Sequence, residues 1–172
     1  MVKGIGILIV IFGSSGLGLS IVRERKAYLE QCRAWRELFG LIENEIAFQK
    51  SSLPEICGRA GMHLRDDKKL FLESIGGTFD RGEGGTLGEI WRREADRVLS
   101  EKPLKKEVED EIKGMGEKLC FEDSEMQRKM LQDIEKYLRK HEEEQENADK
   151  ERNKLTLCAG VMGGLLLTIL FL

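Results

Sequence analysis

Two long uncharged segments, one at each end, limit most strongly what this 172-residue chain can fold into. Residues 4–22 are 19 consecutive positions without a charged side chain, and residues 155–172 form a second run of 18. A membrane-spanning helix needs roughly 20 predominantly apolar residues. The pattern therefore predicts an N-terminal transmembrane helix at 1–22 and a C-terminal transmembrane helix at 155–172.

The first segment also has a competing interpretation as a nucleotide-binding loop. The stretch "ILIVIFGSSGLGLSIVRE", residues 7–24, resembles the strand, glycine loop and helix that open a short-chain dehydrogenase. That interpretation requires a second strand with an acidic ribose ligand about 20 residues later, where this chain has a helical pattern. Neither Tyr28 nor Tyr137 has the lysine four residues later that such enzymes use. The 11 Ile, Leu, Val and Phe residues within 4–22 favour a membrane span.

A cleaved signal peptide is a further alternative for the first segment. Lys3 makes only a weak n-region, however, and no small-residue cleavage motif follows the apolar run. Cytoplasmic loops carry an excess of Lys and Arg, and six basic residues flank the inner ends of the two segments: Arg23, Arg25, Lys26, Lys150, Arg152 and Lys154. We therefore expect a protein of the cell membrane whose domain at 23–154 lies in the cytoplasm.

The middle of the chain is dense in charges of both signs. All 31 acidic and 27 of the 28 basic residues fall within 23–154. This mixture is typical of solvated helix faces, and the lack of a net basic patch argues against a nucleic-acid partner. The basic residues next to the spans suit lipid headgroups. The 4 cysteines are scattered without a C-x-x-C pair, so neither disulfides nor zinc are indicated.

No arrangement of residues indicates catalysis. His63 and His141 are far apart, and neither belongs to a metal-ligand pattern such as H-E-x-x-H. His141 opens a charged run and is expected to be solvated. The GEGG stretch at 82–85 lacks the lysine of a phosphate loop. We expect no catalytic residue, metal or cofactor, and we place Trp35 and Trp91 in the core because they lie on apolar stripes.

Apolar residues recur at three- and four-residue steps through 23–154, which is the spacing of one helix face. We predict an all-α fold, a membrane-anchored small helical bundle between the two transmembrane helices. The first helix should continue from the first span to about residue 49. Forms of the S-x-x-E capping box at 52–55 and 86–89 predict two further helix starts.

Three other segments complete the predicted bundle. A helix at "DKKLFLESI" should bury Leu70, Phe71 and Ile75 before the glycine-rich stretch 76–85 forms a loop. Another helix is expected around residues 104–115, and a last one should begin at 123 or 124 and continue into the second span. Between 139 and 154 that helix is charged all round, which is typical of a solvent-exposed stalk.

Small residues recur at four-residue spacing inside both predicted spans. Gly160 and Gly164 form G-x-x-x-G, and Gly16 with Ser20 forms a weaker pair of the same kind. Such spacing lets two transmembrane helices approach closely. Glycine is also simply common in membrane helices, so helix packing and composition explain the spacing equally well.

Several segments, taken in order, resemble the stage III sporulation protein AB family: "WRELFGLIENEIAFQKSSLPEI", "LGEIWRREA", "GEKLCFEDSEMQRKML" and "CAGVMGGLLLTILFL". Together with the two bracketing spans they extend over nearly the whole chain. Cys120 departs from the glycine of the family's L-G-x-x-D-x-x-x-Q stretch, whereas Asp123 and Gln127 fit it. The resemblance implies a membrane protein of the mother cell that faces the forespore, with a soluble domain similar to the F-type platform protein of type II secretion.

What the resemblance further implies is a non-enzymatic platform that couples a cytosolic secretion-type ATPase to other subunits of the sporulation channel. By analogy, six polar residues are candidates for the partner contact: Glu89, Arg92, Arg93, Glu122, Asp123 and Gln127. Capping and solvation would explain the same residues. A tether or sensor unconnected with secretion is the alternative function. The sequence leaves open whether the ATPase contact is direct and whether the protein forms a homo-oligomer.

Overall fold

A computed structural model describes residues 2–48, 52–82, 84–120 and 123–170, with side chains described within 23–152. In these residues the chain forms helices and no strand, as the all-α prediction requires. The helices are α1 (Val2–Phe48), α2 (Leu53–Met62), α3 (Asp66–Asp80), α4 (Leu87–Leu99), α5 (Lys106–Lys118) and α6 (Ser124–Leu170).

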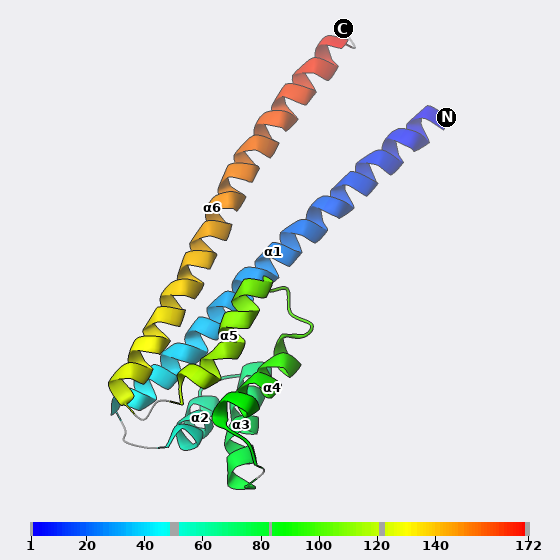
Figure 1. Cartoon of the computed structure of the whole chain (residues 1–172). Coiled ribbons are helices and arrows are strands. Elements are labelled where there is room, and N and C mark those ends of the chain that lie inside the picture. The colour runs from blue at the N-terminus through cyan, green and yellow to red at the C-terminus, as the bar shows by residue number, and fades with distance from the viewer. Residues whose placement is uncertain (1, 49–51, 83, 121–122, 171–172) are drawn as a thin grey trace.

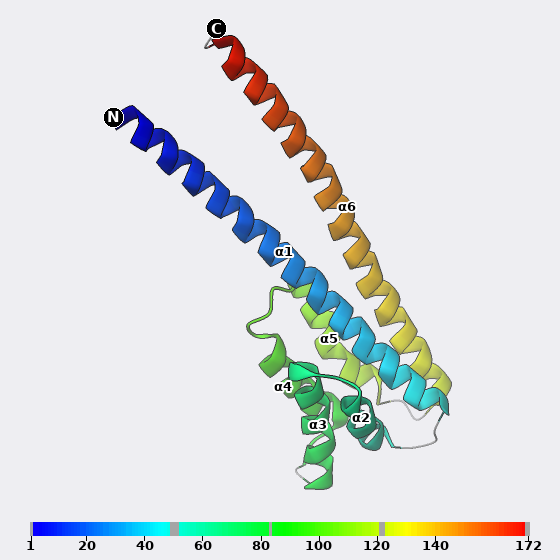
Figure 2. The same ribbon diagram turned by 180° about the vertical axis from the view of Figure 1, so that it is seen from behind.

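The two longest helices, α1 and α6, run antiparallel and form the spine of the molecule (Figure 1). The four short helices pack beside the half of this spine that is far from both termini, as Figures 1 and 2 show from opposite sides. α5 packs against both α4 and α6, while α2 and α3 pack against each other and against α1. Both termini therefore extend from the same side of a single helical domain.

The stretch with two interpretations, residues 7–24, lies entirely inside α1. The chain is helical where a dehydrogenase would need a strand followed by a loop, and the described residues contain no sheet that could hold such a loop. The nucleotide-loop interpretation is therefore excluded.

Residues 2–22 and 155–170 of the predicted spans lie within α1 and α6, but the side chains that would test the spans are not described. Gly16, Ser20, Gly160 and Gly164 consequently remain predicted packing positions. Within the described residues, no helix combines the length and the apolar character needed to cross a bilayer.

Four aromatic side chains form the centre of the core. Trp35 and Phe39 on α1 meet Phe71 on α3 and Trp91 on α4, with ring centroids 5.2 Å apart for Trp35 and Phe71 and 4.9 Å apart for Phe71 and Trp91. Both of these pairs are edge-to-face, a favourable arrangement of aromatic quadrupoles. Trp35 and Trp91 are fully buried, so the prediction that both belong to the core is confirmed.

α4 and α5 approach each other closely because glycines stand at the contact. A Cβ at Gly116 would lie 2.3 Å from the Cβ of Trp91, and a Cβ at Gly88 would lie 2.8 Å from the Cγ of Glu117. The Trp91 indole Nε1 donates a hydrogen bond of 2.8 Å to the carbonyl oxygen of Ile112. The tryptophan is thereby buried without an unsatisfied donor.

The capping prediction at 86–89 is confirmed. The Thr86 backbone N–H donates to Glu89 Oε2 at 2.9 Å, and the Glu89 N–H donates to Thr86 Oγ1 at 3.3 Å. At the start of α2 the Ser52 N–H donates to Glu55 Oε2 at 3.3 Å. Both helices therefore begin where their sequence signals predict.

The glycine-rich stretch was predicted to be a loop, and half of that prediction is wrong. α3 continues through Gly76 and Gly77 to Asp80. Gly76 serves the packing of α3 on α2, since a Cβ there would stand 3.3 Å from the carbonyl oxygen of Pro54. The chain turns only afterwards, at Gly82 (φ 63°) and Gly85 (φ 144°), two backbone conformations that favour glycine.

The predicted inward face of α3 is also partly wrong. Phe71 and Ile75 are buried, but Leu70 is 66% exposed and Lys68 is only 3% exposed. The Lys68 ammonium donates to Gln31 Oε1 at 2.8 Å and lies 4.8 Å from the centroid of the Trp35 ring. These contacts let a lysine occupy the position that an apolar residue would otherwise fill.

The stalk predicted at 139–154 is mostly exposed where its side chains are described, but one side of it lies against α1. Glu142 is 7% exposed and accepts a hydrogen bond of 2.9 Å from Arg36 of α1. His141 was expected to be solvated, but its ring packs against Tyr137 with centroids 4.6 Å apart. Glu142 is buried within a mostly exposed charged run because Arg36 and Arg33 of α1 supply partners of opposite charge.

Candidate interaction surface

The first predicted group of contact residues lies on α4. Glu89 is held by the capping box, so its carboxylate is committed to the start of the helix. Arg92 Nη2 lies 3.0 Å from Glu117 Oε1 of α5, and these side chains are 52% and 65% exposed. Arg93 is 59% exposed and pairs with Glu94 at 3.3 Å. The two arginines therefore present charge to solvent.

The second predicted group lies where α6 begins. Asp123 Oδ1 accepts a hydrogen bond of 3.0 Å from the Glu125 N–H, which makes it a capping residue. Gln127 Nε2 donates to the carbonyl oxygen of Leu119 at 3.0 Å. Glu122 lies outside the described residues. The capping explanation thus applies to Asp123, and Gln127 fastens α6 to the end of α5.

The structure brings the two groups to the same end of α5, which the sequence did not indicate. Arg92 reaches Glu117 and Gln127 reaches Leu119, two residues apart at the C-terminal end of α5. This end lies next to the start of α6, far from the two chain termini (Figure 1). Together we call Arg92, Arg93, Glu117, Asp123 and Gln127 the distal surface.

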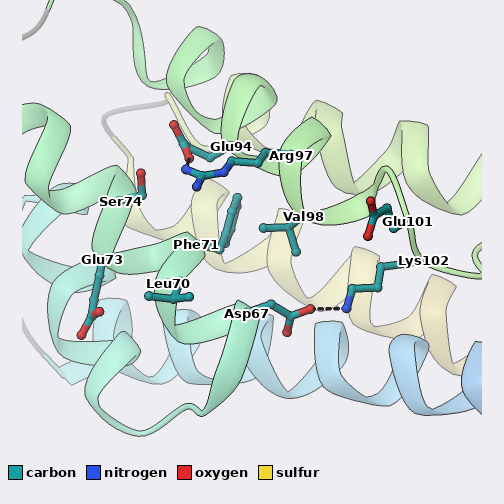
Figure 3. A pocket seen from close by; sticks show the side chains of 10 residues that line it. All are labelled: Asp67, Leu70, Phe71, Glu73, Ser74, Glu94, Arg97, Val98, Glu101 and Lys102. Atoms are coloured by element: carbon teal, nitrogen blue, oxygen red, sulfur yellow. Dashed lines mark ion pairs between the residues drawn. The ribbon is translucent and has the colours of Figure 1, made fainter.

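A groove between α3 and α4 lies beside this surface and was missed by sequence reasoning. It has a volume of about 530 Å³. Phe71, Val98 and the exposed Leu70 supply its apolar surface, while Asp67 and Lys102 pair across one end at 2.8 Å (Figure 3). Its remaining charged residues carry both signs: Glu73, Glu94, Arg97 and Glu101. No signal in the sequence indicated this groove, because Leu70 was expected to lie in the core.

A second groove lies at the opposite end of the domain, between α1, α6 and the loop that joins α4 to α5. It has a volume of about 380 Å³ and is lined by Glu24, Arg25, Tyr28, Pro103, Leu104, Lys105 and Gln145. The Lys105 ammonium lies 5.4 Å from the centroid of the Tyr28 ring. The α4–α5 loop is therefore held against the part of α1 that follows the predicted span.

Burial is the main cause of the shifted pKa values of Cys57 and Lys68. Desolvation raises the pKa of the Cys57 thiol to about 12 and lowers the pKa of the Lys68 ammonium. Burial alone would raise the pKa of Asp67, but Lys102 and Lys68 bring that pKa below its usual value. Within the described residues no cluster of His, Cys, Asp or Glu is arranged to hold a metal ion.

The fold and its surfaces define a class of protein: a small all-helical domain carried on two long helices, with charged side chains available for contact. The family model described as Stage III sporulation protein AB matches residues 3–172. The chain belongs to this family, whose members are components of the channel apparatus of sporulation.

The fold is also found in a solved structure titled "Stage III sporulation protein AB (SpoIIIAB)". That structure matches with a TM-score of 0.63 and 21% sequence identity, covering 73% of this chain and 98% of that chain. At this identity the similarity shows the fold alone. The comparison with curated proteins gave no match.

Proposed function

We propose that this chain is a non-enzymatic platform of the channel between mother cell and forespore. Its helical domain would couple a cytosolic secretion-type ATPase to the membrane complex. The observation that carries this proposal is the distal surface, where two separately predicted groups of polar residues meet at the end of α5 that lies away from both termini. A partner in the cytoplasm would meet this end first.

The register of α1 and α6 supports the membrane part of the proposal. Arg25 Nη1 lies 2.6 Å from Asp149 Oδ1. The cytoplasmic end of the first predicted span, Val22, precedes Arg25 by three residues. The corresponding end of the second span, Leu155, follows Asp149 by six residues. At 1.5 Å per residue these steps are about 4.5 Å and about 9 Å. Both spans would thus begin within about 5 Å of the same level, as two helices entering one bilayer surface should.

The charges of the distal surface are available to a partner. Ion pairs as exposed as Arg92 with Glu117 contribute about 0 to 1 kcal/mol to stability. They can therefore be exchanged for contacts with another protein at little cost to the fold. Charged side chains at the edge of an interface mainly set partner choice and association rate.

The first test is affinity purification of the full chain from detergent-solubilised membranes of sporulating cells. A chain that lacks residues 23–154 serves as the control. Recovery of a secretion-type ATPase with the full chain alone supports the platform function. If no ATPase and no channel subunit is recovered even after crosslinking, the platform function is rejected and the tether or sensor alternative takes its place.

A charge reversal tests the distal surface itself. The double variant Arg92→Glu with Arg93→Glu should recover several-fold less ATPase, because two exposed positive charges become negative. Lys136→Glu is the matched control, since Lys136 is 76% exposed on α6 and pairs only with Asp133, at 3.8 Å, among the described ion pairs. Equal recovery with both variants would remove the distal surface from the proposal.

A further inference from the structure

The α3–α4 groove combines an exposed leucine with an apolar floor. Leu70 of α3 is 66% exposed, Phe71 beside it is buried, and Val98 of α4 is partly buried. Figure 3 shows Leu70 and Val98 on the two sides of the groove. Apolar surface of this kind is stabilised when an apolar side chain of another molecule covers it.

α3 and α4 run in opposite directions along the groove. Asp67 near the start of α3 pairs at 2.8 Å with Lys102, which follows the end of α4. At the other end of the groove, Ser74 of α3 lies near Glu94 of α4 (Figure 3). Leu70 stands three residues after Asp67, and Val98 stands four residues before Lys102. The two apolar side chains are therefore at about the same level.

The two helices carry the same order of charges on either side of the groove. Each has a base, an apolar residue and an acid: Lys69, Leu70 and Glu73 on α3, and Arg97, Val98 and Glu101 on α4. In both helices the base comes one position before the apolar residue and the acid comes three positions after it. Because the helices are antiparallel, each end of the groove carries a base from one helix and an acid from the other.

A second copy of the chain, rotated by 180° about an axis along the groove, matches this pattern. α3 of each copy then lies over α4 of the other, as in an isologous contact. Every charged side chain that lines the groove would face a suitable group of the other copy: Asp67 and Lys102, Lys69 and Glu101, Glu73 and Arg97, and Glu94 and Ser74. A partner with charges of one sign would instead place like charges together at both ends of the groove.

The charges beside the apolar centre are available for such a contact. Arg97 is 82% exposed, and its nearest approach to Glu94 is 4.0 Å. Lys69 and Glu73 are each 45% exposed and lie 3.7 Å apart. Ion pairs as exposed as these contribute little to stability. The side chains can therefore pair with a second copy at little cost to the fold.

We infer that the α3–α4 groove is the contact surface between two copies of this chain. Leu70 of each copy packs on Val98 and Phe71 of the other, and the charges at the two ends of the groove fix the register. This dimer goes beyond the proposed function and does not depend on the identity of the cytosolic partner.

The first test measures the mass of the full chain in detergent by analytical ultracentrifugation over a range of protein concentrations. We expect a dimer, and Leu70→Asp should weaken its association at least about tenfold because a carboxylate would be buried against Val98. Phe48→Asp is the matched control, since Phe48 is 85% exposed at the end of α1, outside the groove. A chain that is monomeric at every concentration overturns the inference, and so does a dimer that Leu70→Asp leaves unchanged.

A charge exchange tests the register of the two copies. Arg97→Glu and Glu73→Arg should each weaken the dimer several-fold, because each places like charges opposite one another. The two substitutions together should restore the association. Both side chains are exposed, and circular dichroism establishes that the variants are folded. A double variant that associates no better than the single variants overturns the proposed arrangement.

Discussion

The two helix pairs α1–α6 and α4–α5 are held together in different ways. Where their side chains are described, α1 and α6 are joined by a row of ion pairs that includes Arg25 with Asp149, Arg33 with Glu146 and Arg36 with Glu142. α4 and α5 also have ion pairs, Arg92 with Glu117 and Asp96 with Lys113. Close packing distinguishes this pair, because Gly116 lets the Trp91 side chain lie directly on the α5 backbone. Charge pairs set which residues stand opposite one another, whereas close packing sets the distance between two helices.

The largest effect should come from breaking the close packing. Gly116→Ala places a methyl group 2.3 Å from the Trp91 Cβ, so α4 and α5 must separate at a cost of about 3 kcal/mol. For a chain of this size the loss corresponds to a drop in Tm of roughly 6 to 12 °C, measured by circular dichroism in detergent.

Gly114→Ala is the matched control for this substitution. It lies on the same helix, and a Cβ there would meet nothing within 4 Å. It should raise stability by about 0.5 to 1 kcal/mol, because alanine favours the helix over glycine. If both substitutions lower Tm equally, α5 is intolerant of change in general and the contrast between the two helix pairs is lost.

A smaller effect is expected from the ion-paired helices. The Glu142 side chain is nearly buried and forms ion pairs with both Arg36 and Arg33. Glu142→Gln should therefore cost about 1 to 2 kcal/mol, with the exposure of the arginines keeping the loss below that of a fully buried pair. The measurement is the same thermal unfolding.

Glu146→Gln sharpens this comparison within α6. Glu146 pairs with Arg33 at 2.6 Å, but its side chain is 40% exposed and that of Arg33 is 52% exposed. Its loss should be below about 0.5 kcal/mol. A loss equal to that of Glu142→Gln would mean that burial does not govern the strength of these ion pairs.

The smallest effect concerns pH. Burial lowers the pKa of the His141 imidazole in the folded chain, while Glu144 partly opposes this shift. The unfolded chain therefore takes up the proton first, and stability falls as pH drops from about 6.5 through the lowered pKa. His141→Gln should lose less stability than the wild type between pH 7.5 and pH 5.5. An identical pH dependence of Tm in both proteins would contradict this assignment.

Local signals predicted the helices well. The helix that starts after Thr86 begins where its capping box predicts, and α1 continues from the first apolar segment as expected. The aromatic core also followed from apolar spacing, because Trp35 and Trp91 stand on stripes with a helical period. Leu70 was assigned to the wrong side of α3 and the burial of Lys68 was not predicted, since which residues of a helix face inward also depends on the partners that other helices provide.

The candidate contact residues were chosen from the sequence and the family resemblance. That the two groups lie close together is seen only in the structure. Arg92 and Gln127 are 35 positions apart, and only the fold places both at one end of α5. The α3–α4 groove and the groove beside Tyr28 were not predicted, because a groove depends on how neighbouring segments are placed and not on one helix alone.

By itself, the sequence determined the helices, their starting points, the aromatic core and the position of the two uncharged segments, because capping and hydrophobic period act over a few neighbouring residues. The tertiary structure alone decided the rest. It buried Lys68 and Glu142 beside Gln31 and Arg36, pressed Gly116 against Trp91, and brought the α4–α5 loop to Tyr28. These contacts join residues far apart in the chain, so they depend on packing that no local pattern records.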